Sequence, residues 1–145
     1  MPSAHFTSHN KRTPKMNRIT STITYGNKLP RDQRDEWQRQ ANPWTAEVRY
    51  KRRKMTVNYW TGPMYPGEPT TKDVAYCLLA DAQCLEYTQS FEEWCNDICM
   101  DTDSLKAYRT YQQVIKQTDS LKRILGSDFE EFIGLNEDEL KRRCR

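Results

Sequence analysis

The clearest pattern of apolar and polar positions is helical and lies between residues 69 and 126. Apolar residues recur there at steps of three and four, which places them on one face of a helix. Before each apolar run stands a polar residue of a type that can cap a helix. The pattern therefore predicts three helices, at about 71–87, 90–99 and 103–125.

The predicted caps support these boundaries. Thr70 followed by Asp73, and Ser90 followed by Glu93, have the three-residue spacing of a capping box. The segment Asp101-Thr-Asp-Ser104 precedes the third helix and is rich in capping residues. The DxDS sequence is thus expected to begin a helix.

Beyond the third helix the signals are shorter. Gly126 fits the C′ position that ends a helix. We expect short helices within 127–144, the first capped by Ser127 and the last by Asn136.

Strict alternation of apolar and polar residues predicts a β-hairpin at about 45–61. The residues that share a face in this pattern are Val48 and Tyr50 in the first strand, and Met55, Val57 and Tyr59 in the second. Four basic residues, 51–54, fall at the tip. The tip lacks an Asn-Gly pair, so the pattern leaves the turn type open.

The segments before the hairpin carry weaker signals. Residues 1–18 are basic and lack an apolar period, which is typical of a flexible tail. Residues 19–25 are rich in β-branched side chains and fit a short strand. Residues 31–41 are charged, with Trp37 as their large apolar residue, and fit a short exposed helix that ends at Asn42-Pro43.

These elements predict one α+β domain over 19–145, with a small antiparallel β-hairpin packed on a cluster of three or more helices. The expected core residues are Val48, Val57, Leu78, Leu85, Phe91, Trp94, Tyr111, Ile115 and Leu121. The apolar supply is thin, at 36% hydrophobic residues, although aromatic side chains bury large areas each. Asp81 falls near the apolar stripe of its helix, as a partly buried carboxylate or a boundary residue.

Charge is distributed unevenly along the chain. Residues 1–72 carry 14 Lys and Arg against 5 Asp and Glu, a net +9, whereas residues 73–145 carry 9 against 15, a net −6. This division indicates two surfaces with different partners, or a polar contact between the two halves.

The five cysteines do not have the spacing of a metal site. They stand at positions 77, 84, 95, 99 and 144. Two pairs follow helical spacing, which favours small buried side chains over zinc ligands, since a zinc site usually shows a close pair in a turn. The histidines, His5 and His9, lie in the predicted tail. We therefore expect no metal and no cofactor.

No catalytic set emerges from the remaining residues. Asp101-Thr-Asp-Ser104 could begin a calcium loop, but Leu105 and Lys106 stand where a further oxygen ligand and a glycine are needed. Asp97, Asp101 and Asp103 could hold Mg²⁺ in a nuclease, which is a remote alternative. There is no Gly-rich phosphate loop. Without an apolar run of about 18 residues or a signal-peptide core, the sequence predicts a cytoplasmic protein that does not enter a membrane.

The basic hairpin is the best binding candidate in the sequence. Its residues are Arg49, Tyr50, Lys51, Arg52, Arg53, Lys54, Tyr59 and Trp60. Basic side chains can follow phosphates while aromatic rings stack on single-stranded bases. The competing interpretation is a solvated turn whose charge prevents aggregation of strand edges.

Several segments, taken in order, resemble a group of small uncharacterised proteins encoded by bacteriophages and other mobile elements. They are Met55-Thr-Val-Asn-Tyr-Trp-Thr-Gly62, Pro69-Thr-Thr-Lys-Asp-Val-Ala-Tyr-Cys-Leu-Leu-Ala-Asp-Ala82, Ser90-Phe-Glu-Glu-Trp94, Asp101-Thr-Asp-Ser-Leu-Lys-Ala107 with Tyr111, and Leu121-Lys-Arg-Ile-Leu-Gly126. Cys99-Met100 stands where that group often has glycine and an aromatic residue. The resemblance implies a mobile-element origin and no known catalytic residues.

Two hypotheses of function follow. The first is a non-enzymatic phage or mobile-element protein that binds a host protein or nucleoprotein complex. In its most specific form this hypothesis predicts an antagonist of a host defence system, similar to an anti-CRISPR protein. The alternative is an accessory protein that binds single-stranded nucleic acid through the basic hairpin.

Overall fold

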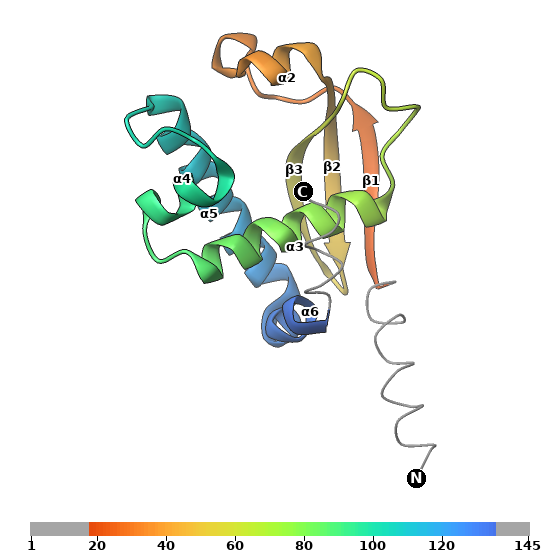
Figure 1. Ribbon diagram of the computed structural model, residues 1–145. Helices are drawn as coiled ribbons and strands as arrows, with labels where there is room; N and C mark the ends of the chain where they lie inside the picture. Colours follow the sequence, from red (N-terminus) through yellow and green to blue (C-terminus); the bar gives the residue numbers. More distant parts are fainter. Residues whose placement is uncertain (1–17, 136–145) are drawn as a thin grey trace.

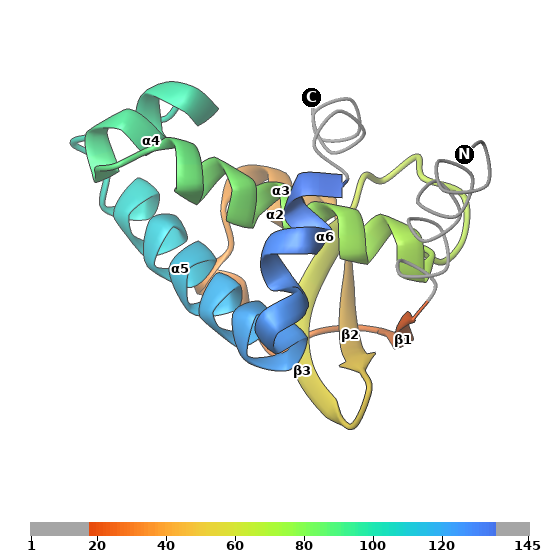
Figure 2. The ribbon, with the colours of Figure 1, turned by 90° about the horizontal axis from the view of Figure 1, so that it is seen from below.

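The computed structural model describes residues 18–135 and shows an α+β fold. A three-stranded antiparallel sheet is covered on one face by helices, as Figure 1 and Figure 2 show from two directions. The predicted tail and the last predicted helix, capped by Asn136, lie outside the described residues. The fold class expected from the pattern is thus confirmed.

The sheet is built from β1 (Ile19–Tyr25), β2 (Asn42–Tyr50) and β3 (Arg53–Thr61), in that spatial order. The predicted hairpin is β2 and β3, and the weaker strand signal is β1, which pairs with β2 so that Ile19 lies opposite Tyr50. Ala46, Val48 and Tyr50 of β2 and Met55 and Val57 of β3 are buried on the inner face, and the residues between them are exposed or half-buried, as alternation predicts.

The hairpin turn contains two residues, Lys51 and Arg52. Lys51 has a φ of 56°, whereas Arg52 is not at positive φ. A positive φ at the first position alone fits a type II′ turn, which usually has glycine there. Lys51 therefore occupies a backbone conformation that costs a non-glycine residue free energy.

The sheet includes a proline in its middle strand, where the sequence predicted only a helix stop. Pro43 has no N–H, yet its carbonyl accepts a hydrogen bond from the Gly26 amide at 2.7 Å. The hydroxyl of Thr45 donates to the Gly26 carbonyl at 2.7 Å. Thr45 thus supplies the donor that Pro43 lacks, and β2 begins at Asn42 without a break in pairing.

Five helices accompany the sheet in the described part of the chain. They are α2 (Glu36–Gln40), α3 (Thr71–Tyr87), α4 (Phe91–Ile98), α5 (Leu105–Leu125) and α6 (Phe129–Leu135), with 3₁₀ turns at Arg31–Gln33 and Gly126–Asp128. The predicted exposed helix at 31–41 is therefore a 3₁₀ turn followed by the short α2. None of the described helices has the length and apolar character that crossing a membrane requires.

The predicted N-caps of the three main helices are present. Thr70 Oγ1 accepts from the Asp73 amide at 3.1 Å, and Asp73 Oδ2 accepts from the Thr70 amide at 3.0 Å, which completes the capping box. Ser90 Oγ accepts from the Glu93 amide at 3.2 Å. The Glu93 carboxylate instead accepts from the amide of Gln89, one residue before the cap.

The DxDS segment caps a helix, as expected. Ser104 Oγ accepts from the Ala107 amide at 3.2 Å, and Asp101 Oδ1 accepts from the Asp103 amide at 3.0 Å. The predicted cap at Ser127 is wrong. The 3₁₀ turn after α5 runs directly into α6, and no side chain caps that turn.

The main core lies between the inner face of the sheet and α3, α5 and α6. The expected core residues that are buried are Val48, Val57, Leu78, Trp94 and Leu121. Leu85, Phe91, Tyr111 and Ile115 are only half-buried. Leu85, Phe91 and Tyr111 belong to a separate small cluster between α3, α4 and α5, around Trp94, Cys95 and Ala107. That cluster has no sheet over it, which explains the remaining exposure.

Candidate binding surfaces

The predicted binding hairpin is divided between the two faces of the sheet. Tyr50 lies in the core with 1% of its surface exposed, and its hydroxyl donates to Asp128 Oδ2 at 2.7 Å. Its ring meets Phe132 edge to face, with 5.4 Å between centroids. Burial, together with the hydrogen bond to Asp128, raises the pKa of Tyr50 to about 12. The prediction that Tyr50 can stack on a base is therefore wrong, because its ring is inaccessible.

Most cations at the tip hold other parts of the chain. The Lys51 ammonium lies 3.2 Å from Asp128 Oδ2. Arg53 Nη1 donates to the carbonyl of Arg123 at 2.8 Å, and Arg123 Nη2 donates back to the carbonyl of Lys54 at 2.9 Å. These contacts fix the end of α5 against the hairpin, a role that the sequence pattern did not indicate.

The outer cations are also partly engaged. Arg49 pairs with Glu47, and the Lys54 ammonium lies 3.8 Å from the same carboxylate. The hydrogen bond from Arg49 is the main reason why the pKa of Glu47 is lowered. Among residues 18–135, Arg52 makes no described ion pair or hydrogen bond. It borders a hollow of about 450 Å³ between the tip and the turn that follows α5.

The two remaining aromatic candidates point in opposite directions. Tyr59 is half-buried against α3, where its hydroxyl lies 3.5 Å from Cys77 Sγ. Trp60 lies on the other face, and the guanidinium of Arg34 sits 5.1 Å from its ring centroid. Of the predicted rings, Trp60 is thus the one that lies on the outer face, half-buried and with Arg34 over it.

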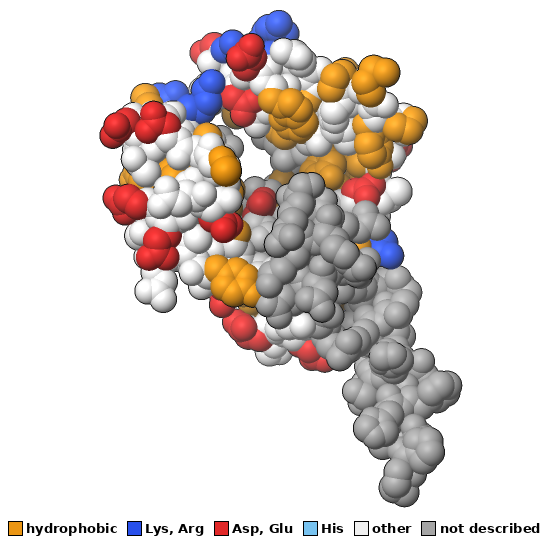
Figure 3. Space-filling model, in the orientation of Figure 1, with side chains coloured by type: hydrophobic (Ala, Val, Ile, Leu, Met, Phe, Trp, Pro, Cys, Tyr) orange, Lys and Arg blue, Asp and Glu red, His pale blue; other side chains and the backbone are white. Residues whose placement is uncertain are grey.

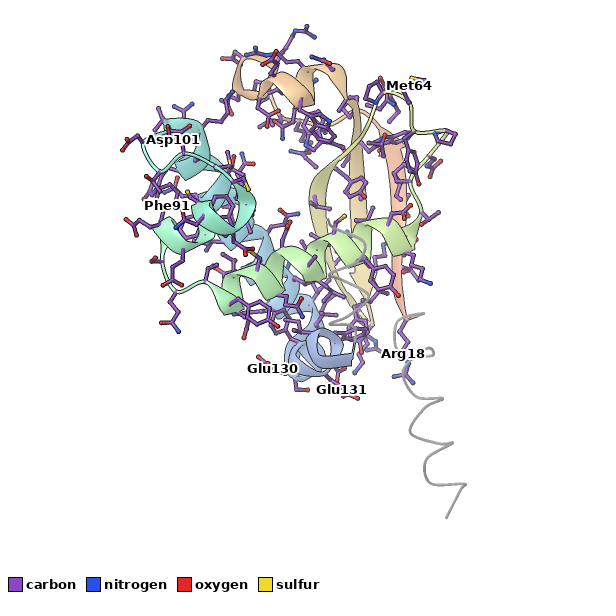
Figure 4. All side chains as sticks on the ribbon, viewed as in Figure 1. Arg18, Met64, Phe91, Asp101, Glu130 and Glu131 are labelled. Carbon is purple, nitrogen blue, oxygen red and sulfur yellow. The ribbon has the colours of Figure 1, made fainter. Side chains whose placement is uncertain are left out.

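A different surface gathers four of the eight large apolar side chains that are exposed in the described part of the chain; the other four are Tyr87, Ile98, Leu105 and Tyr108, on α3, α4 and α5. Met64 is 91% exposed, Tyr25 68%, Trp37 52% and Tyr65 40%. They come from the end of β1, from α2 and from the loop after β3, and lie at one end of the sheet (Figures 3 and 4). We call this surface the aromatic end and define it by Tyr25, Trp37, Trp44, Trp60, Met64 and Tyr65.

The aromatic end is ordered by local contacts. The Tyr25 ring meets Trp44 edge to face at 5.3 Å, and the Trp44 indole N–H donates to Thr61 Oγ1 at 2.9 Å. The Tyr65 hydroxyl donates to Asp73 Oδ2 at 2.8 Å, which ties the loop to the cap of α3. Exposed rings held in place in this way can bind a partner with little loss of side-chain entropy.

Charge at the aromatic end is nearly balanced. Residues 26–41 carry four Lys and Arg against three Asp and Glu, and the loop at 62–70 adds one Glu. Blue and red side chains are mixed there in Figure 3. The sequence pattern did not indicate this surface because these segments lack periodicity. The available signal was the presence of large apolar residues in a loop rich in proline and glycine, which cannot bury them.

A groove begins at the aromatic end and follows the free edge of β3. Its volume is about 290 Å³. One wall is formed by β3 from Met55 to Trp60, and the other by residues of α5 that include Gln113, Lys116 and Gln117. No Asp or Glu lines the groove.

The cysteines and acidic residues do not converge. No group of three or more His, Cys, Asp or Glu able to hold a metal ion occurs within residues 18–135. Cys84 Sγ donates to Asp97 Oδ2 at 3.1 Å. Burial, helped by Asp97, raises the pKa of Cys84 to about 12, so this thiol stays protonated at neutral pH. Cys95 is buried and Cys99 is exposed.

Comparison with models of known protein families, with curated proteins and with solved structures finds no significant match to this chain.

Proposed function

We propose that this chain is a non-catalytic protein that binds another protein through the aromatic end. The observation that supports this is the clustering of exposed Tyr, Trp and Met side chains at one end of the sheet, without an excess of either charge. Aromatic residues and methionine are enriched at protein interfaces, and exposed apolar patches mark interaction sites. A nucleic-acid surface would instead combine such rings with a strong positive potential.

The alternative of single-stranded nucleic-acid binding through the hairpin has weaker support. That function needs several rings and cations on the same surface, but Tyr50 and Tyr59 face the helices, which leaves Trp60 as the one predicted ring on the outward face with Arg49 and Lys54. Arg52 and the hollow beside it remain as the observation that favours a phosphate contact.

The resemblance to phage and mobile-element proteins suggests the biological setting. We propose that the partner is a host protein, alone or within a nucleoprotein complex. We further propose that the chain acts as an antagonist of a host defence system, similar in kind to an anti-CRISPR protein. Binding without catalysis is sufficient for such a role, since occupying a functional surface of the target inhibits it.

Capture experiments with matched variants test the proposal. The full chain is used as bait in an extract of a bacterial host, and bound proteins are identified by mass spectrometry. Trp37→Ala and Met64→Ser alter the aromatic end, whereas Leu105→Ser removes an apolar side chain of intermediate exposure, between those of Trp37 and Met64, from α5 as the control.

We expect a partner that the wild type and Leu105→Ser retain and that Trp37→Ala and Met64→Ser lose, because truncating a central aromatic contact typically costs 2 kcal/mol or more. Equal retention by all four chains would contradict the assignment to the aromatic end. Tight binding of the purified chain to single-stranded DNA near 150 mM salt, with no host factor present, would favour the alternative.

A further inference from the structure

The free edge of β3 carries main-chain groups that are available for pairing. The amide of Gly26 bonds to the carbonyl of Pro43, so Pro43 and every second residue of β2 after it direct their main-chain groups toward β1. In β3, the residues paired with these positions include Lys54, Thr56 and Asn58. Their N–H and C=O groups point away from the sheet.

A contact at the end of this edge near the hairpin tip supports the outward direction of these main-chain groups. The carbonyl of Lys54 accepts a hydrogen bond from Arg123 Nη2 at 2.9 Å, which is possible only if it points outward. The next residues whose main-chain N–H and C=O groups point outward are Thr56, Asn58 and Trp60. Within residues 18–135 no described hydrogen bond uses their main-chain atoms. The edge is therefore occupied by a hydrogen bond at Lys54, whereas from Thr56 to Trp60 its outward main-chain groups are available for pairing.

The groove lies along this edge, where an added strand would run. Its walls are the edge of β3 and the side of α5, which Figure 2 shows running beside the sheet. Gln113 and Gln117 line it with amide groups that can bond to a peptide main chain, while Leu29 and Trp60 supply an apolar mouth. Strand addition of this kind uses main-chain bonds for affinity and neighbouring side chains for specificity.

Charge around the groove favours an acidic occupant. Lys116 lines the groove, Arg123 lies at its end near the hairpin tip, and Arg34 lies over Trp60 at its mouth, while the Lys54 ammonium near the tip is shared with Glu47. A second copy of this chain, paired edge to edge, would bring two such sets of cations together, and like charges repel. An extended segment containing Asp or Glu is complementary instead.

We propose that the groove binds an extended acidic segment of the partner protein, which adds a fourth strand to the sheet beside β3. This inference depends on the proposed function, in that the partner is a protein. It adds the mode of recognition. The groove pairs with the main chain of the partner and attracts its negative charge, while the adjoining aromatic end contacts apolar surface.

Asn58 offers a test that separates main-chain pairing from side-chain contact. Its N–H points out of the sheet, so Asn58→Pro removes a donor to the partner and no bond to β2. Asn58→Ala keeps the N–H and removes the side chain. Lys116→Glu reverses the charge of the groove, and Lys106→Glu makes the same change on an exposed part of α5 that does not line it.

The probe is a displayed library of nine-residue peptides, selected on the full wild-type chain, with affinities then measured by fluorescence polarisation. We expect acidic peptides whose affinity falls at least tenfold with Asn58→Pro and with Lys116→Glu, and changes less than threefold with Asn58→Ala and Lys106→Glu. Thermal unfolding of each variant verifies that the sheet is retained.

Hydrogen exchange supplies an independent readout. The amides of Thr56, Asn58 and Trp60 should exchange rapidly in the free chain and become protected when peptide is bound. Protection in the free chain would show that the edge is already paired, by a second copy or by the chain itself, and would overturn the inference. Selection of no peptide, or equal binding by Asn58→Pro, would also overturn it. The proposed function would survive either result if capture still depended on Trp37 and Met64.

Discussion

Asp81 of α3 shows how a single carboxylate can weaken a small core. Burial raises the pKa of Asp81 to about 6, which means that the folded state disfavours its charged form. Because the pKa in the folded state lies above the ordinary value of an aspartate, the folded chain binds the proton more tightly than the unfolded chain. The free energy of unfolding should therefore decrease as pH rises from about 4 to 6, and this cost should persist at higher pH.

The variant Asp81→Asn should remove this cost. We expect it to be more stable than the wild type at pH 7.5 by about 1–2 kcal/mol, since one pKa unit corresponds to about 1.4 kcal/mol and partial exposure reduces the effect. Urea denaturation at pH 3.5 and pH 7.5 is the measurement. At pH 3.5 the two chains should differ little, because Asp81 is then largely protonated in both states. A difference that does not depend on pH would contradict this account.

Gly126 is a second residue whose identity the structure requires. It has a φ of 57° and a ψ of −132°, and a Cβ there would lie 3.2 Å from Arg53 Nη1. We expect Gly126→Ala to lower the free energy of unfolding by about 1–3 kcal/mol, because the conformation is strained for alanine and the Cβ crowds Arg53.

Gly134 provides the control for that substitution. It lies within α6, and a Cβ there meets nothing within 4 Å. Gly134→Ala should be neutral or stabilise the chain by up to about 1 kcal/mol through helix propensity. Thermal unfolding of the two variants should therefore shift in opposite directions, or shift only for Gly126→Ala.

At the scale of elements, the helices were predictable because their signals are local. Caps and apolar period lie close together in sequence, so α3 has the predicted bounds and α4 and α5 differ from prediction by one or two residues at an end. The strand β1 had only a weak signal, since its pairing with β2 depends on residues about 20–30 positions away. The predicted cap at Ser127 was wrong because Gly126 leads the chain directly into a 3₁₀ turn that contains Ser127 and has no side-chain cap.

The cap of α4 is the element-level feature most open to test. Ser90→Ala should lower the free energy of unfolding by about 1 kcal/mol, since the Glu93 amide would lose its acceptor. Chemical denaturation measures the effect. Ser90→Asp, which keeps an acceptor near the N-terminus of α4, should restore most of the stability. An unchanged midpoint for Ser90→Ala would mean that this cap contributes nothing.

At the scale of the whole molecule, the basic hairpin illustrates why a site is harder to predict than a fold. The sequence pattern showed the basic residues of the hairpin but not the groups that they contact, because Asp128 and Arg123 approach the tip only in the folded chain. The aromatic end was not predicted for the same reason. Its members come from residues 25 to 65, and none of the connecting segments has a period that would place them together.

The contacts of the tip lead to a prediction about two of its cations. Arg53→Ala should lower the free energy of unfolding by about 1 kcal/mol, because the Arg53 side chain bonds to the end of α5. Arg52→Ala should leave stability within about 0.5 kcal/mol of the wild type, since this exposed side chain has no described partner. Urea denaturation distinguishes the two, and equal losses would contradict the assigned role of Arg53.

The packing of Phe132 against Tyr50 has a consequence for synthesis of the chain. The sheet and α3 are made well before α6, yet the inner face beside Tyr50 lacks part of its cover until Phe132 has been made. Until then the nascent chain exposes an apolar surface, the condition in which chaperones bind and misassembly begins. A product ending after α5 would keep that exposure permanently, so we expect such fragments to aggregate or to be degraded in the cell.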